Sequence, residues 1–290
     1  MPDGRFLVEK YIITYVHSHT ISAAAAKRKY NAGRKELMLI GGVTHPSKSL
    51  PGVLESVRHY ELVKQRAVDA IMKGRDTIGL YGFFGIDDIG GPGGDIKEIE
   101  LLDGAWKNHD ILRDEDVTEG GILGASLAGA FSGYRILHVA TRSVVVPEAP
   151  ILSALVLSSE KGVSGGNGLL NIRKIASLKI AADLVTLSNA FLPPARYSKG
   201  EGIWSLCGSF MDAGARNVAI SIWPVEGAVK TALIKRAYRL ALEEKLPYCS
   251  AFARAKREFI TQKADDSSPG GSPGNYSSPY FWGSFMLYGY

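Results

Sequence analysis

Cysteine is scarce in this chain: its 290 residues include two, Cys207 and Cys249. Two thiols are too few for a disulfide framework and do not suit a cysteine-rich zinc site. His17 and His19 lie two residues apart, but no HExxH or CxxC motif accompanies them. The sequence therefore predicts a protein with no metal and no cofactor.

Long apolar runs are also missing. No stretch reaches the roughly 20 residues that a membrane-spanning helix needs, and Met1 to Phe6 is too polar to begin a signal peptide. The sequence predicts a cytoplasmic protein with no membrane contact. The glycine-rich runs 90–94 and 165–168 lack the lysine and hydroxyl of a GxxxxGK[ST] loop, so they do not support nucleotide binding.

Charge of one sign is in slight excess, with a net charge of +5. One local basic group could hold an acidic partner or nucleic acid, but a solvated surface loop is the better interpretation, and we expect no nucleic acid partner. This group consists of Lys27, Arg28, Lys29, Arg34 and Lys35. Hydrophobic residues make up 46% of the chain, which is enough for a sizeable core.

The pattern along the chain alternates short apolar runs with helical periodicity. Strands are predicted at 36–42, 135–141, 151–157, 184–188, 217–223 and 280–290, with a hairpin or two short strands at 5–15. Helices are predicted at 54–73, 171–178, 202–213, 225–245 and 248–262. A loop or short helix is predicted at 23–34, a loop leading into a helix at 114–127, and a mobile loop at 265–279.

Strands that alternate with helices predict an α/β fold with a mostly parallel sheet and helices on both faces. Reactive groups in such sheets gather at the carboxyl ends of the strands. The places to inspect are therefore the residues after Thr141, Ser188 and Trp223. The sequence shows no internal repeat, and a single domain over 1–290 is predicted.

Six segments spread over nearly the whole chain carry a family resemblance. They are PDGRFLVEKYIITYVHS, YRILHVAT, ILSALVLS, ADLVTLS, KGEGIWSLCGSFMDAGARNVAISIWPVEG and SPYFWGSFMLYGY. Together they resemble the CHAT domain, a family related to caspases and separases. The resemblance implies a three-layer caspase/hemoglobinase-like fold, with N-terminal strands within 1–50, an insertion at about 65–119 and a core caspase-like region at 120–290.

The resemblance implies cysteine proteolysis. In that family one strand ends in His-Gly and another ends in Ala-Cys. The imidazole takes the proton of the thiol, and the thiolate attacks the scissile carbonyl. The two strand ends must therefore be neighbours.

Both catalytic positions hold other residues in this sequence. The family pattern His-x-Ala-Thr-His-Gly corresponds to residues 138–143, which puts Arg142 at the base position and Ser143 at the glycine. The pattern Leu-Ser-Ala-Cys corresponds to residues 187–190, which puts Ala190 at the nucleophile position. A methyl group cannot attack a carbonyl, and a guanidinium with a pKa above about 12 cannot act as a general base at neutral pH.

An engineered change of cysteine to alanine would explain Ala190 but not Arg142 or Ser143. The Phe-Leu-Pro-Pro stretch at 191–194 also departs from the polar, glycine-containing turn of the family, and its prolines lack N–H donors. Several independent departures favour a naturally degenerate site.

Other side chains are candidates to replace the pair. Ser188 lies two residues before Ala190 and His138 four before Arg142, so strand alternation points each to the same side as the position it would replace. The family carries a serine and a histidine here beside its true catalytic pair, so strand packing is the better interpretation. Cys207 falls inside a predicted helix, where core packing is expected.

A binding pocket at the mouth of the sheet is predicted from Arg142, Ser143, Glu201, Trp223 and Glu226. Glu201 and Glu226 each stand where a helix begins, so stabilisation of a helix N-terminus explains them equally well. The aromatic residues at 280–285 are expected in the sheet core.

Two functions follow as hypotheses. The first is an inactive pseudo-protease, a protein-interaction or regulatory module in which Arg142 binds an acidic peptide. The resemblance suggests a tetratricopeptide-repeat region or an active homologue as partner, and a homodimer contact at 280–290. The second is a cysteine-type endopeptidase with a rearranged or engineered-inactive site. A nucleophile and an imidazole within about 4 Å at the strand ends would favour the second.

Overall fold

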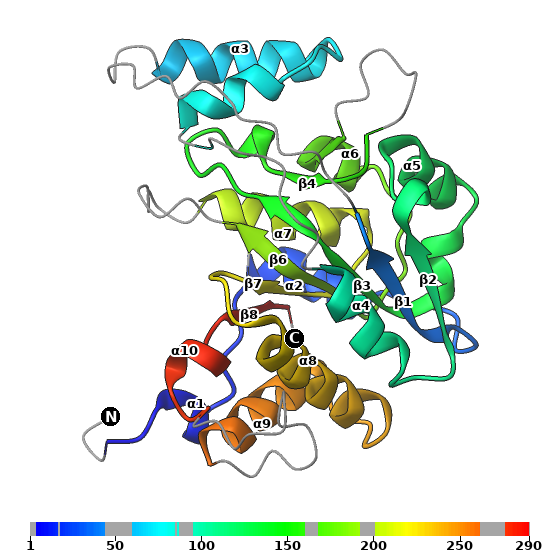
Figure 1. The fold of residues 1–290 in the computed structure, drawn as a ribbon, viewed down its shortest axis with the longest axis vertical. Coiled ribbons are helices and arrows are strands. Elements are labelled where there is room, and N and C mark those ends of the chain that lie inside the picture. Colours follow the sequence, from blue (N-terminus) through cyan, green and yellow to red (C-terminus); the bar gives the residue numbers. More distant parts are fainter. Residues whose placement is uncertain are drawn as a thin grey trace.

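The computed structural model describes residues 4–16, 18–43, 60–84, 86, 95–159, 168–191, 201–261 and 276–289. Within these ranges an eight-stranded sheet runs through the molecule, with helices on both faces (Figure 1). The strands follow the order β2-β1-β3-β6-β7-β8, and β4 and β5 extend from β3. None of the described helices is both long and apolar enough to cross a membrane.

The sheet is mostly parallel: β8 runs antiparallel to β7, β4 to β3 and β5 to β4, and the other pairs are parallel. The strands are β1 (Lys35–Gly41), β2 (His109–Arg113), β3 (Tyr134–Val144), β4 (Ala154–Val156), β5 (Leu169–Asn171), β6 (Leu184–Phe191), β7 (Asn217–Ser221) and β8 (Phe285–Tyr288). The predicted α/β class is confirmed.

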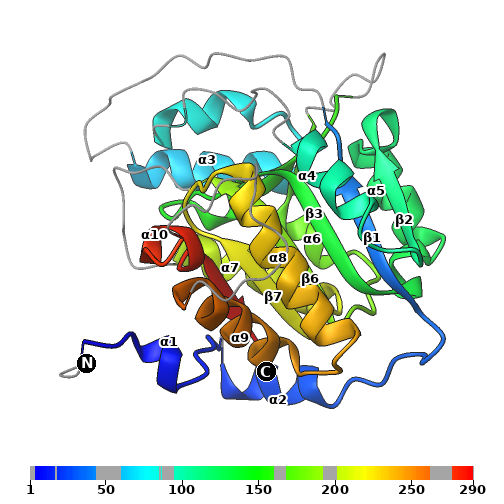
Figure 2. The same ribbon diagram turned by 60° about the horizontal axis from the view of Figure 1, so that its bottom comes forward.

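Two hydrophobic cores fill the space between the sheet and its helical layers. One face packs against α1 (Leu7–Lys10), α4 (Asp95–Asp103), α8 (Gly227–Leu242), α9 (Tyr248–Ile260) and α10 (Pro279–Trp282). Figure 2 shows α8 and α9 lying over this face. The other face packs against α2 (His19–Ala26), α5 (Glu119–Leu127), α6 (Ile172–Ala176) and α7 (Glu201–Ala213).

A smaller apolar cluster lies beside β4. There α3 (Tyr60–Met72) and the 3-10 helix η2 (Ile78–Phe84) pack against η5 (Pro150–Leu152) and neighbouring strand residues. The short 3-10 helices η3 (Asp114–Asp116) and η4 (Ala130–Gly133) precede α5 and β3. Part of the range 65–119 belongs to the main sheet, because β2 pairs along β1 and α4 packs on β1 and β3.

The strands predicted from apolar runs form because both sheet faces are covered. In β3, Ile136 and Ala140 enter one core while Leu137 and Val139 enter the other, so the strand reads as a nearly continuous apolar run. The predicted strands at 36–42, 135–141, 184–188 and 217–223 are confirmed. The strand expected at 151–157 is shorter, because residues 150–152 form η5.

The hairpin predicted at 5–15 is wrong. Residues 7–10 are α1, and the Glu9 carboxylate accepts a hydrogen bond from the Phe6 N–H at 2.6 Å, which caps the first turn. Beyond α1 the segment meets the sheet at Tyr15, which forms an isolated bridge with Tyr288. Local capping and a single tertiary bridge replace the strand pairing expected from the β-branched and aromatic residues.

The strand predicted at 280–290 is partly wrong. Residues 279–282 form α10, which Pro279 and the Ser278 hydroxyl favour at its N-terminus, and β8 is limited to Phe285–Tyr288. The described part of the helix predicted at 54–73 begins at Tyr60. Residues 265–275 of the predicted mobile loop lie outside the described residues.

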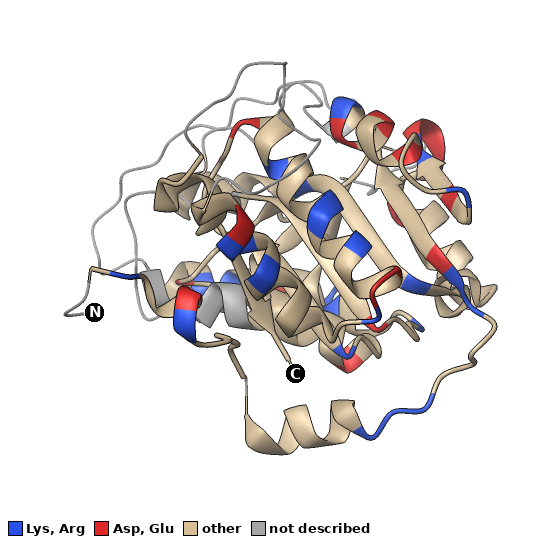
Figure 3. Ribbon diagram, turned by 90° about the horizontal axis from the view of Figure 1, so that it is seen from below, with Lys and Arg blue, Asp and Glu red and all other residues tan. Residues whose placement is uncertain are grey.

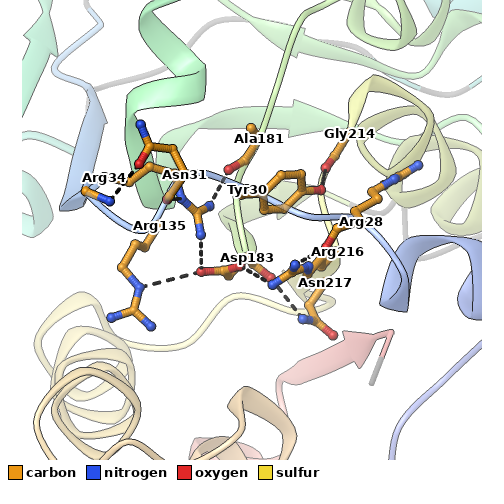
Figure 4. Close-up of polar contacts among 11 residues, drawn as sticks. Arg28, Tyr30, Asn31, Arg34, Arg135, Ala181, Asp183, Gly214, Arg216 and Asn217 are labelled. Atoms are coloured by element: carbon orange, nitrogen blue, oxygen red, sulfur yellow. Dashed lines mark hydrogen bonds and ion pairs between the residues drawn. The ribbon is translucent and has the colours of Figure 1, made fainter.

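The basic group is only partly a solvated loop. Figure 3 shows the basic stretch after α2, and Lys27, Lys29 and Lys35 are exposed. Arg28 and Arg34 turn inward to the amino ends of the strands, where Arg34 Nη2 lies 2.9 Å from Asp183 (Figure 4). Arg216 and Arg135 reach the same carboxylate at 2.7 and 3.5 Å. Arg28 and Arg34 therefore attach the stretch to the sheet, and Arg135 and Arg216 share the Asp183 carboxylate with Arg34.

Candidate functional site

Adjacent strands bring the two family catalytic positions together. In the register of β3 and β6, Arg142 pairs with Asn189 and Ser143 pairs with Ala190. The pairing shifts between Val139 and Arg142, where β3 has one residue more than β6. Arg142 and Ala190 therefore lie on adjacent strands, one register position apart, at the carboxyl ends of β3 and β6.

The side chains at these positions differ in exposure. Arg142 is half-buried, while Ser143 is fully buried and its hydroxyl has no hydrogen-bond partner among the described residues. Ala190 is 8% exposed and belongs to the core on the α7 face. Ala190 therefore lies on β6 beside Ser143, and Arg142 is paired one register position earlier with Asn189.

His138, the candidate base on β3, is fixed inside the core. Its ring is 0% exposed, with Nδ1 3.0 Å from the Tyr238 hydroxyl and Nε2 3.3 Å from Glu98 Oε1. The Tyr238 hydroxyl in turn donates to Thr186 Oγ1 at 2.7 Å. Both nitrogens of the imidazole therefore face buried polar groups of α8 and α4.

Ser188, the candidate nucleophile, is not joined to that imidazole. His138 pairs in register with Thr186, two residues before Ser188. The Ser188 hydroxyl is buried and makes no hydrogen bond within the described part of the chain, and its backbone oxygen accepts from Lys230 Nζ at 3.2 Å. The structure places Ser188 and His138 on neighbouring strands without the hydrogen bond that a nucleophile and its base share.

A buried charged network that was not predicted from the sequence joins α4 and α8 to the ends of β3 and β6. Glu98 on α4 is 1% exposed, and its Oε2 lies 2.9 Å from Lys230 Nζ on α8. Lys230 also donates to Asn189 Oδ1 on β6. Asn189 Nδ2 donates to the Ala140 carbonyl oxygen at 2.6 Å and lies 3.4 Å from Glu98 Oε2. We call these four residues, with His138, the strand-end network.

A weak sequence signal for this network existed. Lys230 lies next to Val229 and three residues before Leu233, so it falls on the apolar face of α8. A lysine at such a position needs a buried partner, because an unpaired charge in a core is costly. The sequence gives no clue that Glu98, 132 positions earlier, is that partner.

The electrostatics of the network favour ionised Glu98. Burial alone raises the pKa of this carboxyl, but the Lys230 ammonium and the His138 ring outweigh burial and hold the pKa well below its usual range. A carboxylate that stays ionised beside a lysine is a structural ion pair, and it is not suited to take a proton during catalysis.

The two cysteines lie away from the strand ends. Cys207 on α7 is fully buried, and burial raises the pKa of its thiol, so the thiol stays protonated. The expected core packing of Cys207 is confirmed. Cys249, in the first turn of α9, is half-buried with the Ser250 hydroxyl at 4.0 Å.

The remaining predicted binding residues are dispersed. Glu201 begins α7, and its side chain lies outside the described part of the structure. Glu226 is exposed and precedes α8 without a capping hydrogen bond. Trp223 is half-buried, and its indole N–H donates to the Tyr280 carbonyl oxygen at 2.9 Å. Through this hydrogen bond, Trp223 in the turn after β7 holds α10 near the end of the chain.

Among the described residues, no group of three or more His, Cys, Asp or Glu side chains is arranged to hold a metal ion. In a comparison with known protein families, the model of the CHAT domain matches residues 1–290, the whole chain. No curated protein matches the sequence. The mostly parallel sheet with two helical layers agrees with the caspase-like fold of that domain.

Proposed function

The chain belongs to the CHAT domain family, which is caspase-like and peptidase-related, and we propose that this member binds peptides without cleaving them. It is a pseudo-protease that acts as a protein-interaction or regulatory module. Its partner is a protein or peptide; a tetratricopeptide-repeat region, an active homologue and a second copy of the chain are the candidates that the family relationship suggests.

One observation carries the proposal: Arg142 and Ala190 occupy neighbouring positions at the ends of β3 and β6. The mechanism of the family needs an acid-base group and a thiolate at these two positions. Arginine stays protonated at any physiological pH, and alanine has no nucleophilic atom. The adjacency of the two strand ends supports a site of the family type, and neither residue can supply the reacting group that the mechanism needs.

The substitutes for the missing pair support the same proposal. His138 is enclosed by Tyr238 and Glu98, so its ring has no route to a substrate within the described residues. Ser188 has no hydrogen bond to an imidazole there. These contacts weigh against a rearranged endopeptidase site, although residues 192–200 after β6 lie outside the described residues.

Arg142 supplies the chemistry for binding. A guanidinium presents a planar fork of N–H donors that matches a carboxylate, and such charge-assisted hydrogen bonds contribute roughly 1.5–3 kcal/mol. Its half-buried position at the strand end strengthens the interaction relative to bulk water. We therefore assign Arg142 the role of holding an acidic side chain or carboxyl terminus of a bound peptide.

The test is selection from a peptide library followed by mass spectrometry of the retained peptides. We expect intact peptides enriched in Asp and Glu, and an affinity lower by roughly ten-fold or more for Arg142→Leu, because one charge-assisted hydrogen-bonded contact is lost. Lys179→Leu is the control. Lys179 is exposed in the loop between α6 and β6, and its substitution also removes one positive charge. Cleaved peptides, or equal binding by both variants, would refute the proposal.

A further inference from the structure

An apolar cavity of about 260 Å³ lies outside the strand-end network, between the N-terminal segment, α9 and β8. Its walls come from three parts of the chain that are far apart in sequence. They include Val8, Ile13, Phe252, Trp282, Phe285 and Leu287. The volume is slightly below the roughly 300–1,000 Å³ typical of small-molecule sites, so the cavity suits a compact ligand.

One charged side chain, Lys256, is among the described residues that line this cavity. It lies on the same face of α9 as Cys249, Phe252 and Ala253, at the spacing of one side of a helix. That face is otherwise apolar. A lysine there directs its ammonium into apolar surroundings.

The Lys256 ammonium is incompletely satisfied by the protein. Its Nζ donates to the Phe285 carbonyl oxygen at 2.6 Å, and an ammonium has three N–H donors. No carboxylate in the described part of the chain forms an ion pair with it. The neighbouring acid on α9, Glu258, binds Arg236 and Arg254 instead. Burial without a counter-ion lowers the pKa of Lys256 to about 8.

We propose that this cavity binds a small amphiphilic anion, an aliphatic monocarboxylate of medium chain length, with its carboxylate on Lys256 and its chain against the apolar walls. The carboxylate of the ligand is the counter-ion of the Lys256 ammonium, which no carboxylate among the described residues provides. The hydrocarbon chain packs against the apolar side chains of the walls, which removes apolar surface from water. A charged head and an apolar body together match the one cation and the apolar lining of the site.

The side chains at the cavity also provide a direct signal. Trp223 and Trp282 both line it, so an occupant changes the environment of two indole rings. Trp223 was expected from sequence in a pocket at the mouth of the sheet, and it belongs to this cavity as well as to the turn after β7. Binding here is independent of Arg142 and Ala190, so this inference stands or falls separately from the proposed peptide binding.

The test uses octanoate as the probe, with calorimetry for the dissociation constant and tryptophan fluorescence for the location. We expect octanoate to bind and to change the fluorescence, octylamine to bind at least ten-fold more weakly, and Lys256→Met to lose at least ten-fold in octanoate affinity. Lys179→Met, which removes a lysine exposed far from the cavity, should bind as the unaltered chain does. Lys256→Arg keeps the cation and should retain binding.

Several outcomes would overturn the inference. They are no binding of octanoate up to its solubility limit, equal affinity of the unaltered chain for octanoate and octylamine, and equal octanoate affinity of Lys256→Met and the unaltered chain. The comparison of the two probes on the unaltered chain holds even if Lys256→Met does not fold. Tighter binding of a short peptide with a free C-terminal leucine would assign the cavity to a protein terminus instead and would also overturn it.

Discussion

At the scale of single residues, Glu98 and Lys230 form an ion pair in the interior of the protein. Each is almost fully buried, and removing an ion from water costs several kcal/mol. Their contact at 2.9 Å, together with the hydrogen bonds through Asn189, offsets that cost. The pair therefore holds α4, α8 and the ends of β3 and β6 together under the degenerate catalytic positions.

Removing one member of the pair should destabilise the protein strongly. We expect Glu98→Gln to lower the free energy of unfolding by about 3–5 kcal/mol, because it leaves the Lys230 charge buried without a counter-ion. Glu100→Gln, an exposed change on the same helix, should have little effect. Urea unfolding measures both. In the double variant with Lys230→Met the two losses should not add, and simple additivity would contradict the ion pair.

The half-buried Lys256 side chain should make the stability of the protein depend on pH in the alkaline range. Its pKa in the folded protein is about 8, below the ordinary 10.5, so between these values the unfolded chain binds more protons than the folded chain. Stability contributed by this group therefore rises with pH across that window. We expect the free energy of unfolding of the unaltered chain to rise relative to Lys256→Met from pH 8 to pH 10.5. A constant difference would show that Lys256 titrates normally.

Among the secondary-structure elements, the N-terminal segment is held by side chains of α9 and by the edge of β8. Arg257 donates to the Val8 carbonyl oxygen at 2.6 Å and to that of Tyr11 at 3.2 Å. The Tyr15 N–H donates to the Leu287 carbonyl oxygen, and Tyr15 accepts from the Gly289 N–H. This segment covers part of the outer edge of β8, the strand where a homodimer contact was predicted.

Loss of the Arg257 contacts should release that segment. We expect Arg257→Ala to accelerate amide hydrogen exchange in residues 7–15, while exchange in β3 and β6 stays unchanged. Arg254→Ala on the same helix removes contacts to Glu244 and Glu258, its ion-pair partners among the described residues, and serves as the control. Hydrogen exchange followed by mass spectrometry distinguishes the two. Equal acceleration by both variants would mean that α9 itself has loosened.

Elements with strong periodicity were predictable from sequence, and those set by distant contacts were not. Secondary-structure type was predicted correctly for β1, β3, β6 and β7 from their apolar runs, and for α8 and α9 from their amphipathic spacing. The predicted ends of these elements differ from the observed ends by a few residues. The segment at 5–15 has β-type residues, but its structure depends on Glu9 capping and on Arg257. Pro279 likewise favours α10 over a longer strand, a local signal that the aromatic composition masked.

In the candidate site, too, the parts indicated by short sequence motifs were predictable, and the parts formed by distant contacts were not. Family motifs placed Arg142 and Ala190 at the ends of two strands, and the sheet register makes them neighbours. The strand-end network and the cavity at Lys256 depend on which helix lies over which strand. No short segment of sequence contains that information. A lysine on an apolar helix face indicates both places, fully buried at Lys230 and half-buried at Lys256, but the sequence does not identify the group that the lysine contacts.

In the molecule as a whole, the amino and carboxyl ends of the sheet strands differ in the role that we assign to them. At the amino ends, Asp183 gathers Arg34, Arg135 and Arg216 and fixes the stretch after α2 (Figure 4). At the carboxyl ends, β3 and β6 carry Arg142 and Ala190 on adjacent strands, next to the strand-end network. Buried charges thus stabilise both ends of the sheet, and the proposed peptide binding belongs to the carboxyl ends alone.

The most direct experiment compares the unaltered chain with the triple variant Arg142→His, Ser143→Gly, Ala190→Cys, using a peptide library and a thiol-reactive probe. We predict that the unaltered chain neither cleaves nor labels at the strand ends, and that the triple variant labels at residue 190, because β3 and β6 already place the two positions on adjacent strands. Cleavage of the library by the unaltered chain would contradict it, and Ser188, His138 and Cys207 would then be the residues to substitute.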